Sequence, residues 1–175
     1  MTILLACALS LIVLVVQTTL LDPVRIAGIA PDLVLVLVYL AGFSLGAPRG
    51  SMIGAVSGLM MDLLSAGPPG LNMATKAAAG CLAGLAGRAV LTPRIWSSAA
   101  PRHMITLGLV SLAQGGMTYG MTRLLGEPPA WWSAVGYIIL PQAVYDGLSG
   151  GALAWVLAWY HGRRGYDAGG SHSWA

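Results

Sequence analysis

Charged side chains are scarce in this chain of 175 residues, because only 9% of them are Asp, Glu, Lys or Arg. Soluble domains carry about 25%, so the surface of a water-soluble globule of this size is not expected. With only two Cys, neither a disulfide framework nor a thiolate metal site is indicated. The chain also has no G-x-x-x-x-G-K-[ST] phosphate loop, no CxxC and no pair of His at zinc spacing. We therefore expect no cofactor and no metal ion.

Apolar residues are abundant instead, at 57% of the chain, together with 24 Gly and 10 Pro. Asp, Glu, Lys, Arg and His are all missing from residues 1–21, 33–48, 104–122 and 128–145. Such runs are typical of lipid-spanning helices, in which Gly and Pro are commoner than in soluble helices. Each spanning helix needs about 20 residues, so six would leave no room for a soluble catalytic domain. The composition predicts an all-α integral membrane protein that is not an enzyme.

Proline positions divide the chain into helices, because proline breaks a helix interior but is accepted in turns. Nine of the ten prolines fall into five clusters, which predicts six spans. We place them at about 2–21, 31–47, 50–66, 71–91, 103–125 and 132–160. Pro141 lies inside the last of these helices, where we expect a kink. Residues 1–164 would then form one six-helix transmembrane domain, followed by a disordered cytoplasmic tail at 165–175.

The basic residues predict the orientation of this domain. Six of them fall on the side that holds both termini and three fall on the other side. Cytoplasmic loops carry the excess of Lys and Arg, so both termini are expected in the cytoplasm. Insertion topology and anionic lipid explain the basic excess, so the expected partner of these charges is the lipid bilayer and no nucleic acid is needed.

Glycines recur at intervals of four residues along four of the predicted helices. Small residues at this spacing let helix backbones approach each other closely. The stripes fit internal packing of the bundle, or at least one of them faces a helix of a partner. The glycines concerned are Gly50, Gly54 and Gly58, then Gly80 and Gly84, Gly116 and Gly120, and Gly147 and Gly151.

Three ionisable residues inside the predicted spans require a specific explanation, because such residues are costly there and are functional candidates by default. Asp62 and Lys76 lie almost equally far from the middle of the turn at 67–70, so they can meet as a structural pair. Alternatively they serve partner binding or transport. Asp146 lies near the centre of the last predicted helix, at a depth similar to that of Asp62.

Two catalytic patterns are present only in weak form. Asp62 and Asp146 could form an aspartyl dyad sharing one proton, but the Gly-x-Gly-Asp of intramembrane aspartyl proteases is absent. The segment 147–151 matches G-x-S-x-G around Ser149, yet no histidine is well placed as its base. The remaining charges look architectural, including Asp32, which follows Pro31 at the start of the second predicted helix and meets the helix dipole there.

The chain resembles the bacterial rod shape-determining MreD family. The likeness lies in Pro31-Asp32-Leu33-Val34-Leu35 and in Gly58-Leu59-Met60-Met61-Asp62-Leu63-Leu64-Ser65, followed by Gly70 at the outer turn. Lys76 is not part of that pattern. The resemblance implies a noncatalytic inner-membrane subunit of the elongasome, the machinery that builds the lateral cell wall. It also implies six helices similar to the substrate-binding subunits of energy-coupling factor vitamin transporters.

The resemblance further implies MreC as the principal partner, and through it the bacterial actin MreB and the RodA glycosyltransferase with its penicillin-binding transpeptidase. We expect a scaffold that presents glycine-rich helix faces to the single span of MreC and helps to maintain rod cell shape. The alternative is a transporter or solute-binding subunit with a midplane pocket of Asp62, Lys76 and Asp146. Whether the chain forms a homo-oligomer stays open.

Overall fold

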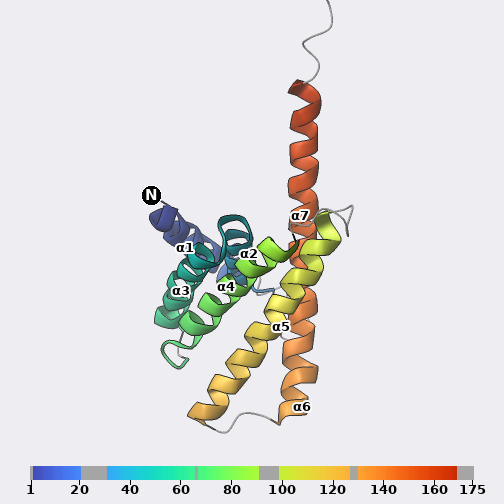
Figure 1. Cartoon of the computed structure of the whole chain (residues 1–175). Coiled ribbons are helices and arrows are strands. Elements are labelled where there is room, and N and C mark those ends of the chain that lie inside the picture. The colour runs from blue at the N-terminus through green and yellow to red at the C-terminus, as the bar shows by residue number, and fades with distance from the viewer. Residues whose placement is uncertain (1, 21–30, 66, 91–98, 127–129, 169–175) are drawn as a thin grey trace, which may run out of the picture.

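The computed structural model describes residues 2–20, 31–65, 67–90, 99–126 and 130–168, and these are almost entirely helical (Figure 1). The elements are α1 Thr2–Leu20, α2 Leu33–Leu45, α3 Ala47–Leu64, α4 Leu71–Val90, α5 Ala99–Leu125, α6 Trp131–Ala134, the π-helix η2 Val135–Ile139 and α7 Leu140–Ala168. The predicted all-α fold is confirmed, and the predicted helices coincide with these elements to within a few residues at most ends.

The membrane-spanning part of the prediction is contradicted. Within the described ranges, no helix combines the length and the apolar character needed to cross a membrane. This finding corrects the six predicted spans and the multi-pass inner-membrane localisation, and the orientation predicted for the two termini rested on those spans. Scarcity of charge is not the same as strong hydropathy, since the uncharged run at 104–122 holds four glycines and a glutamine. The apolar α2 has only 13 residues, or about 20 Å against a hydrocarbon core of about 30 Å.

Helix α2 lies at the centre of the molecule, in contact with α1, α3, α4, α5 and α7. Its sequence is apolar on every side, which is the pattern of a buried helix. Figure 1 shows α1 to α4 as one group and α5 and α7 running beside each other as a second. The main core joins the two groups and consists of Leu35, Val36, Tyr39, Ala79, Ala83, Leu107 and Val110.

The glycine stripes of α3 and α4 face each other within the chain. A Cβ added to Gly54 would lie 2.1 Å from the carbonyl oxygen of Lys76, and one added to Gly80 would lie 2.1 Å from that of Gly50. One added to Gly58 would lie 2.2 Å from the carbonyl oxygen of Asn72. Only glycine permits such an approach, so this stripe holds the hairpin of α3 and α4 together and is not open to a partner.

The last helix is interrupted by a π-helical turn just before the predicted kink at Pro141. In η2 the N–H of Leu140 donates to the carbonyl of Val135, five residues earlier. Pro141 has no N–H to continue the regular ladder, which is why the irregularity falls here. Beyond it α7 continues to Ala168 and extends past the other helices (Figure 1). Residues 165–168 are thus helical, and the rest of the predicted tail lies outside the described residues.

Candidate functional site

A buried ion pair stands at the N-terminus of α2. Asp32 caps this helix, because its Oδ1 accepts a hydrogen bond of 2.9 Å from the N–H of Leu35. Its Oδ2 accepts a hydrogen bond from Nζ of Lys76, which reaches it from α4. The Lys76 side chain is fully buried and that of Asp32 is 14% exposed. The pair therefore joins α2 to α4 inside the protein.

Asp146 brings α7 to the same place. Its Oδ1 accepts a hydrogen bond of 2.8 Å from the backbone N–H of Asp32 and one of 3.0 Å from Nε2 of Gln142. Its Oδ2 accepts one of 2.6 Å from the hydroxyl of Ser111 on α5. Asp146 is fully buried, so these donors replace the water that its carboxylate has lost. We call Asp32, Lys76, Ser111, Gln142 and Asp146 the carboxylate cluster.

The two carboxylates of this cluster have different proton affinities. Burial raises the pKa of Asp32, but the charge and hydrogen bond of Lys76 and the N–H of Leu35 outweigh it, and the pKa lies below its ordinary value. Burial and then the negative charge of Asp32 raise the pKa of Asp146 to about 6, against hydrogen bonds that favour its charged form. The cluster can therefore take up one proton at Asp146 in mildly acidic solution, which balances its net charge.

Asp62 acts elsewhere, at the turn between α3 and α4. Its carboxylate accepts four hydrogen bonds of 3.0 Å, from the backbone N–H groups of Gly70, Asn72 and Met73 and from the side chain of Asn72. Burial raises the pKa of Asp62, but the four hydrogen bonds together lower it by more than burial raises it. The pKa therefore lies below its ordinary value. Asp62 thus caps the N-terminus of α4 from another helix. Gly70 has a φ of 86°, which favours glycine at this turn.

The predicted residues fall into two separate groups. Lys76 bonds Asp32, so the predicted pair with Asp62 is absent. Asp62 and Asp146 do not share a site, so the aspartyl dyad is absent as well. None of Asp62, Lys76 and Asp146 lines either of the two cavities beside α5 that are described below. Pro31 directly precedes Asp32, whose predicted architectural role at the start of this helix is that of its N-cap.

A second polar contact was not predicted from the sequence. The hydroxyl of the fully buried Tyr39 lies 2.9 Å from Nδ1 of His103 and also bonds Oγ1 of Thr106. The His103 ring packs edge-on to Phe43, with 4.7 Å between centroids. Burial and then the charge of Arg102 lower the pKa of His103. This contact fixes the start of α5 on α2. Ser149 is engaged elsewhere, because its hydroxyl donates a hydrogen bond of 2.8 Å to the backbone oxygen of Asp146, at a position far from His103 in the sequence.

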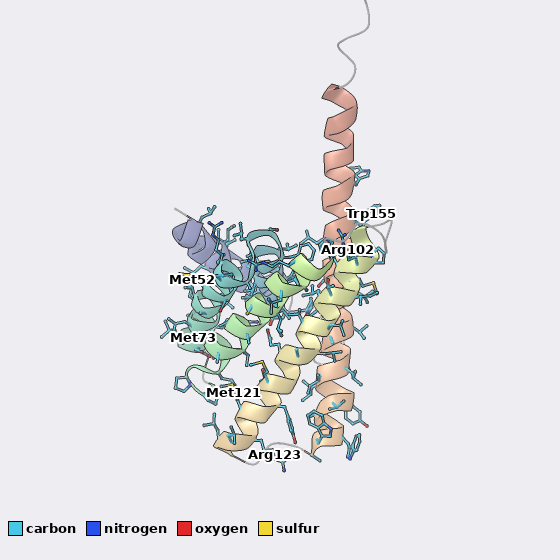
Figure 2. The ribbon with its side chains drawn as sticks, viewed as in Figure 1. Met52, Met73, Arg102, Met121, Arg123 and Trp155 are labelled. Carbon is cyan, nitrogen blue, oxygen red and sulfur yellow. The ribbon has the colours of Figure 1, made fainter. Side chains whose placement is uncertain are left out.

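Two hollows flank α5, whose ends are marked by Arg102 and Arg123 in Figure 2. The first is a cavity of about 240 Å³ between α5 and the segment formed by α6, η2 and the start of α7. The second is an apolar groove of about 260 Å³ between α5 and α7. We call the second the apolar groove, and it is lined by Met104, Ile105, Gly108, Leu109, Leu112, Leu140, Ala143, Val144 and Gly147.

The described ranges hold no group of three His, Cys, Asp or Glu arranged to bind a metal ion. No protein-family model, curated protein or solved structure matches this chain.

Proposed function

We propose that the chain is a noncatalytic scaffold subunit of the cell-wall elongation complex, and that it binds an apolar helix of MreC along the apolar groove. The identity of the partner rests on the resemblance to the MreD family. The observation that carries the mode of binding is an open face on α5 and α7, where large apolar side chains stand exposed around a groove.

The groove has the character of a helix-binding surface. Leu109 is 59% exposed, Val144 60% and Leu140 47%, so its walls present leucine and valine side chains to the exterior. Contiguous exposed apolar surface of this kind marks an interaction site. A partner helix buries such surface by placing every third or fourth side chain into the groove.

The glycines of α5 extend the same face beyond the groove. Leu112 lines the groove, and Gly116 and Gly120 follow it at intervals of four residues, which keeps them on one side of the helix. A Cβ added to Gly116 or to Gly120 would meet no atom within 4 Å. This stripe therefore differs from that of α3, which is filled by α4, and it leaves room for the backbone of a second helix.

The hydrogen bonds of the candidate nucleophile, Ser149, and of the candidate base, His103, favour a scaffold over an enzyme. Ser149 donates its hydrogen to a backbone oxygen of its own helix. His103 bonds Tyr39 through Nδ1. The carboxylate cluster, whose hydrogen bonds join α2, α4, α5 and α7, fixes the relative positions of the helices that form the groove.

The test is copurification of the full chain with MreC after Gly116→Leu and Gly120→Leu substitution, made singly and together. Each added side chain projects into the space that the partner helix would occupy. We expect at least a tenfold loss of recovered MreC in the double variant. Circular dichroism of the purified variants should be unchanged, because the fold leaves this space empty.

The matched control is Leu63→Trp on α3, whose side chain is 76% exposed and lies away from α5 and α7. It also adds bulk to an exposed apolar position, and we expect it to recover as much MreC as the wild type. Equal recovery from the wild type and the double glycine variant would refute the proposed face. Failure of the wild type itself to recover MreC would refute the proposed partner.

A further inference from the structure

The cavity on the other side of α5 shares no residue with the apolar groove, so it calls for a separate explanation. Its volume is about 240 Å³. A cavity of about 150 Å³ accepts benzene, so this one has room for an aromatic ring with a branched substituent. Its wall runs from the buried Ile139, which is 8% exposed, to Ile138, which is 54% exposed. The cavity therefore reaches from the interior toward the surface.

The carboxylate of Asp146 lies behind the wall of this cavity. Ser111 on α5 and Gln142 on α7 both line the cavity, and both also bond Asp146. The hydroxyl of Ser111 donates to Oδ2 at 2.6 Å, and Nε2 of Gln142 donates to Oδ1 at 3.0 Å. One hydrogen bond therefore joins each of these two lining residues to the carboxylate.

The negative charge of Asp146 is not balanced by an ion pair with any of the described residues. Lys76 is paired with Asp32, so these two charges cancel. The donors to the Asp146 carboxylate are a backbone N–H, a hydroxyl and an amide, none of which is charged. Burial and then the charge of Asp32 accordingly raise the pKa of Asp146 to about 6. Above this pH an unpaired negative charge lies beside the cavity, and it attracts a cation strongly because the surrounding dielectric is low.

The lining of the cavity fits a cation better than an anion. No Lys, Arg or His of the described ranges lines it, and Arg123, which follows the lining residue Thr122, is exposed at the end of α5 (Figure 2). The hydroxyls of Ser111 and Thr122 donate within the protein, so neither is a donor for a bound anion. Tyr119 also lines the cavity, and aromatic side chains attract quaternary ammonium groups.

The opposite wall offers apolar contacts. It consists of Ala134, Ile138 and Ile139, and the two isoleucines belong to the π-helical turn η2. Turns of this kind are rare and occur often at functional sites. An occupant can therefore bury an apolar body against η2 while its charged group lies toward Ser111 and Gln142.

We propose that this cavity binds a small organic cation of the quaternary ammonium type, which the carboxylate of Asp146 attracts across the wall formed by Ser111 and Gln142. The apolar body of the cation contacts η2. A quaternary ammonium group has no N–H, so it needs no acceptor in the wall. The proposal does not depend on MreC binding, because the cavity and the apolar groove share no residue.

The test uses phenyltrimethylammonium and tert-butylbenzene as probes of the purified full chain, with equilibrium dialysis at pH 8 as the measurement. The two molecules have the same shape and differ in one atom, which is a charged nitrogen in the first and a carbon in the second. We expect saturable binding of phenyltrimethylammonium at a single site of the wild type. Absence of saturable binding of this cation would overturn the proposal.

Asp146→Asn identifies the charge that attracts the cation. Asparagine keeps one acceptor oxygen and has no charge. The dissociation constant of phenyltrimethylammonium should therefore rise at least about tenfold, while that of tert-butylbenzene stays within about twofold of the wild type. An equal change for the two probes, or no change for the cation, would refute the role of Asp146 and with it the proposal.

The pH dependence of the wild type tests the same charge without a variant. Between pH 8 and pH 5 Asp146 takes up a proton, since its pKa is about 6. Asp32 stays ionised and paired with Lys76, because its pKa lies below the ordinary value, and His103 does not line the cavity. The affinity for phenyltrimethylammonium should fall at least about threefold, and that for tert-butylbenzene should stay constant. If Asp146→Asn loses its helical circular dichroism, this comparison decides, and a constant affinity for the cation contradicts the proposal.

Ala134→Leu locates the site, because Ala134 is 4% exposed and a longer side chain there fills the cavity. It should abolish binding of both probes. Gly120→Leu is the control, since it adds bulk to α5 where an added Cβ meets no atom within 4 Å, and it should bind both probes like the wild type. If a folded Ala134→Leu retains the affinity of the wild type for phenyltrimethylammonium, the cation binds elsewhere and the assignment of the cavity is wrong.

Discussion

The backbone N–H of Asp32 donates a hydrogen bond of 2.8 Å to Oδ1 of Asp146, a residue 114 positions further along the chain. The N-cap residue of α2 is thereby tied to the second turn of α7. Lys76 completes the contact by bonding the Asp32 carboxylate from α4. Three helices and two negative charges thus depend on a single buried ammonium group.

Replacing Lys76 by methionine should destabilise the protein strongly. The substitution leaves Asp32 and Asp146 close together without a positive charge, and breaking a buried pair in this way costs about 3–5 kcal/mol. The free energy of unfolding from urea titrations measures this. The double variant Lys76→Met, Asp32→Asn should regain part of the loss, because it removes the uncompensated charge. Arg123→Met, at an exposed position on α5, is the control and should change little.

Asp146 should make the protein more stable as the pH falls from 7 to 5. Its pKa in the folded protein, about 6, lies above the value of 3.8 that it has when unfolded. The folded state therefore binds more protons in this window, and protonation removes a destabilising buried charge. The expected gain is about 1 kcal/mol between pH 7 and pH 5. His103 acts in the opposite direction, since its lowered pKa makes the folded state harder to protonate.

The difference in the free energy of unfolding between the wild type and Asp146→Asn separates the contribution of Asp146 from that of His103. Asparagine keeps one acceptor oxygen for Asp32 and Gln142, and the hydroxyl of Ser111 can turn to accept from the new amide. The stability advantage of Asp146→Asn over the wild type should therefore shrink from pH 7 to pH 5. A difference that stays constant across this range would show that Asp146 does not titrate there.

The number and positions of the helices could be predicted because proline and charge mark their ends locally. Whether those helices cross a membrane could not be predicted from the scarcity of charge. The run at 104–122 has no charged residue, but its serine and glutamine serve the carboxylate cluster and the cavity wall. The lack of charge in this run therefore goes together with polar side chains and glycines, which interrupt its apolar character.

The partner of Lys76 depends on how α3 and α4 are aligned with each other, which cannot be read from the sequence. Equal distance from the turn predicted Asp62 as its partner. In the structure the backbone of Lys76 lies opposite Gly54, which is eight residues from Asp62, or about 12 Å along α3. The Lys76 side chain is thus free to reach Asp32 on α2. Asp32 could be identified as the partner of Lys76 only once the position of α2 relative to α4 was known.

Adding a methyl group to the buried glycine stripe should unfold or weaken the hairpin of α3 and α4. In Gly54→Ala and Gly80→Ala the new Cβ would lie 2.1 Å from a backbone oxygen, so the helices must separate. We expect a loss of about 1–3 kcal/mol in each case. Gly116→Ala is the matched control, since its Cβ meets nothing and the better helix propensity of alanine should raise stability by up to about 1 kcal/mol. Equal effects at the three positions would contradict the assignment of the stripes.

Asp62 should contribute to stability in proportion to the acceptor oxygens that it retains. Oδ1 accepts both bonds of Asn72, and Oδ2 accepts those of Gly70 and Met73. Asp62→Ala removes both oxygens and should cost about 2 kcal/mol, because the N-terminus of α4 loses its cap. Asp62→Asn keeps one oxygen and should cost about half as much. Leu63→Ala, at an exposed neighbour, is the control and should stay within about 0.5 kcal/mol of the wild type.

Because the pKa of Asp62 is lowered, its contribution should persist at neutral pH and disappear as the pH falls below about 4. Thermal unfolding at pH 7 and pH 3 measures this, and a loss in Asp62→Asn as large as in Asp62→Ala would show that the negative charge, rather than the number of acceptors, holds the turn.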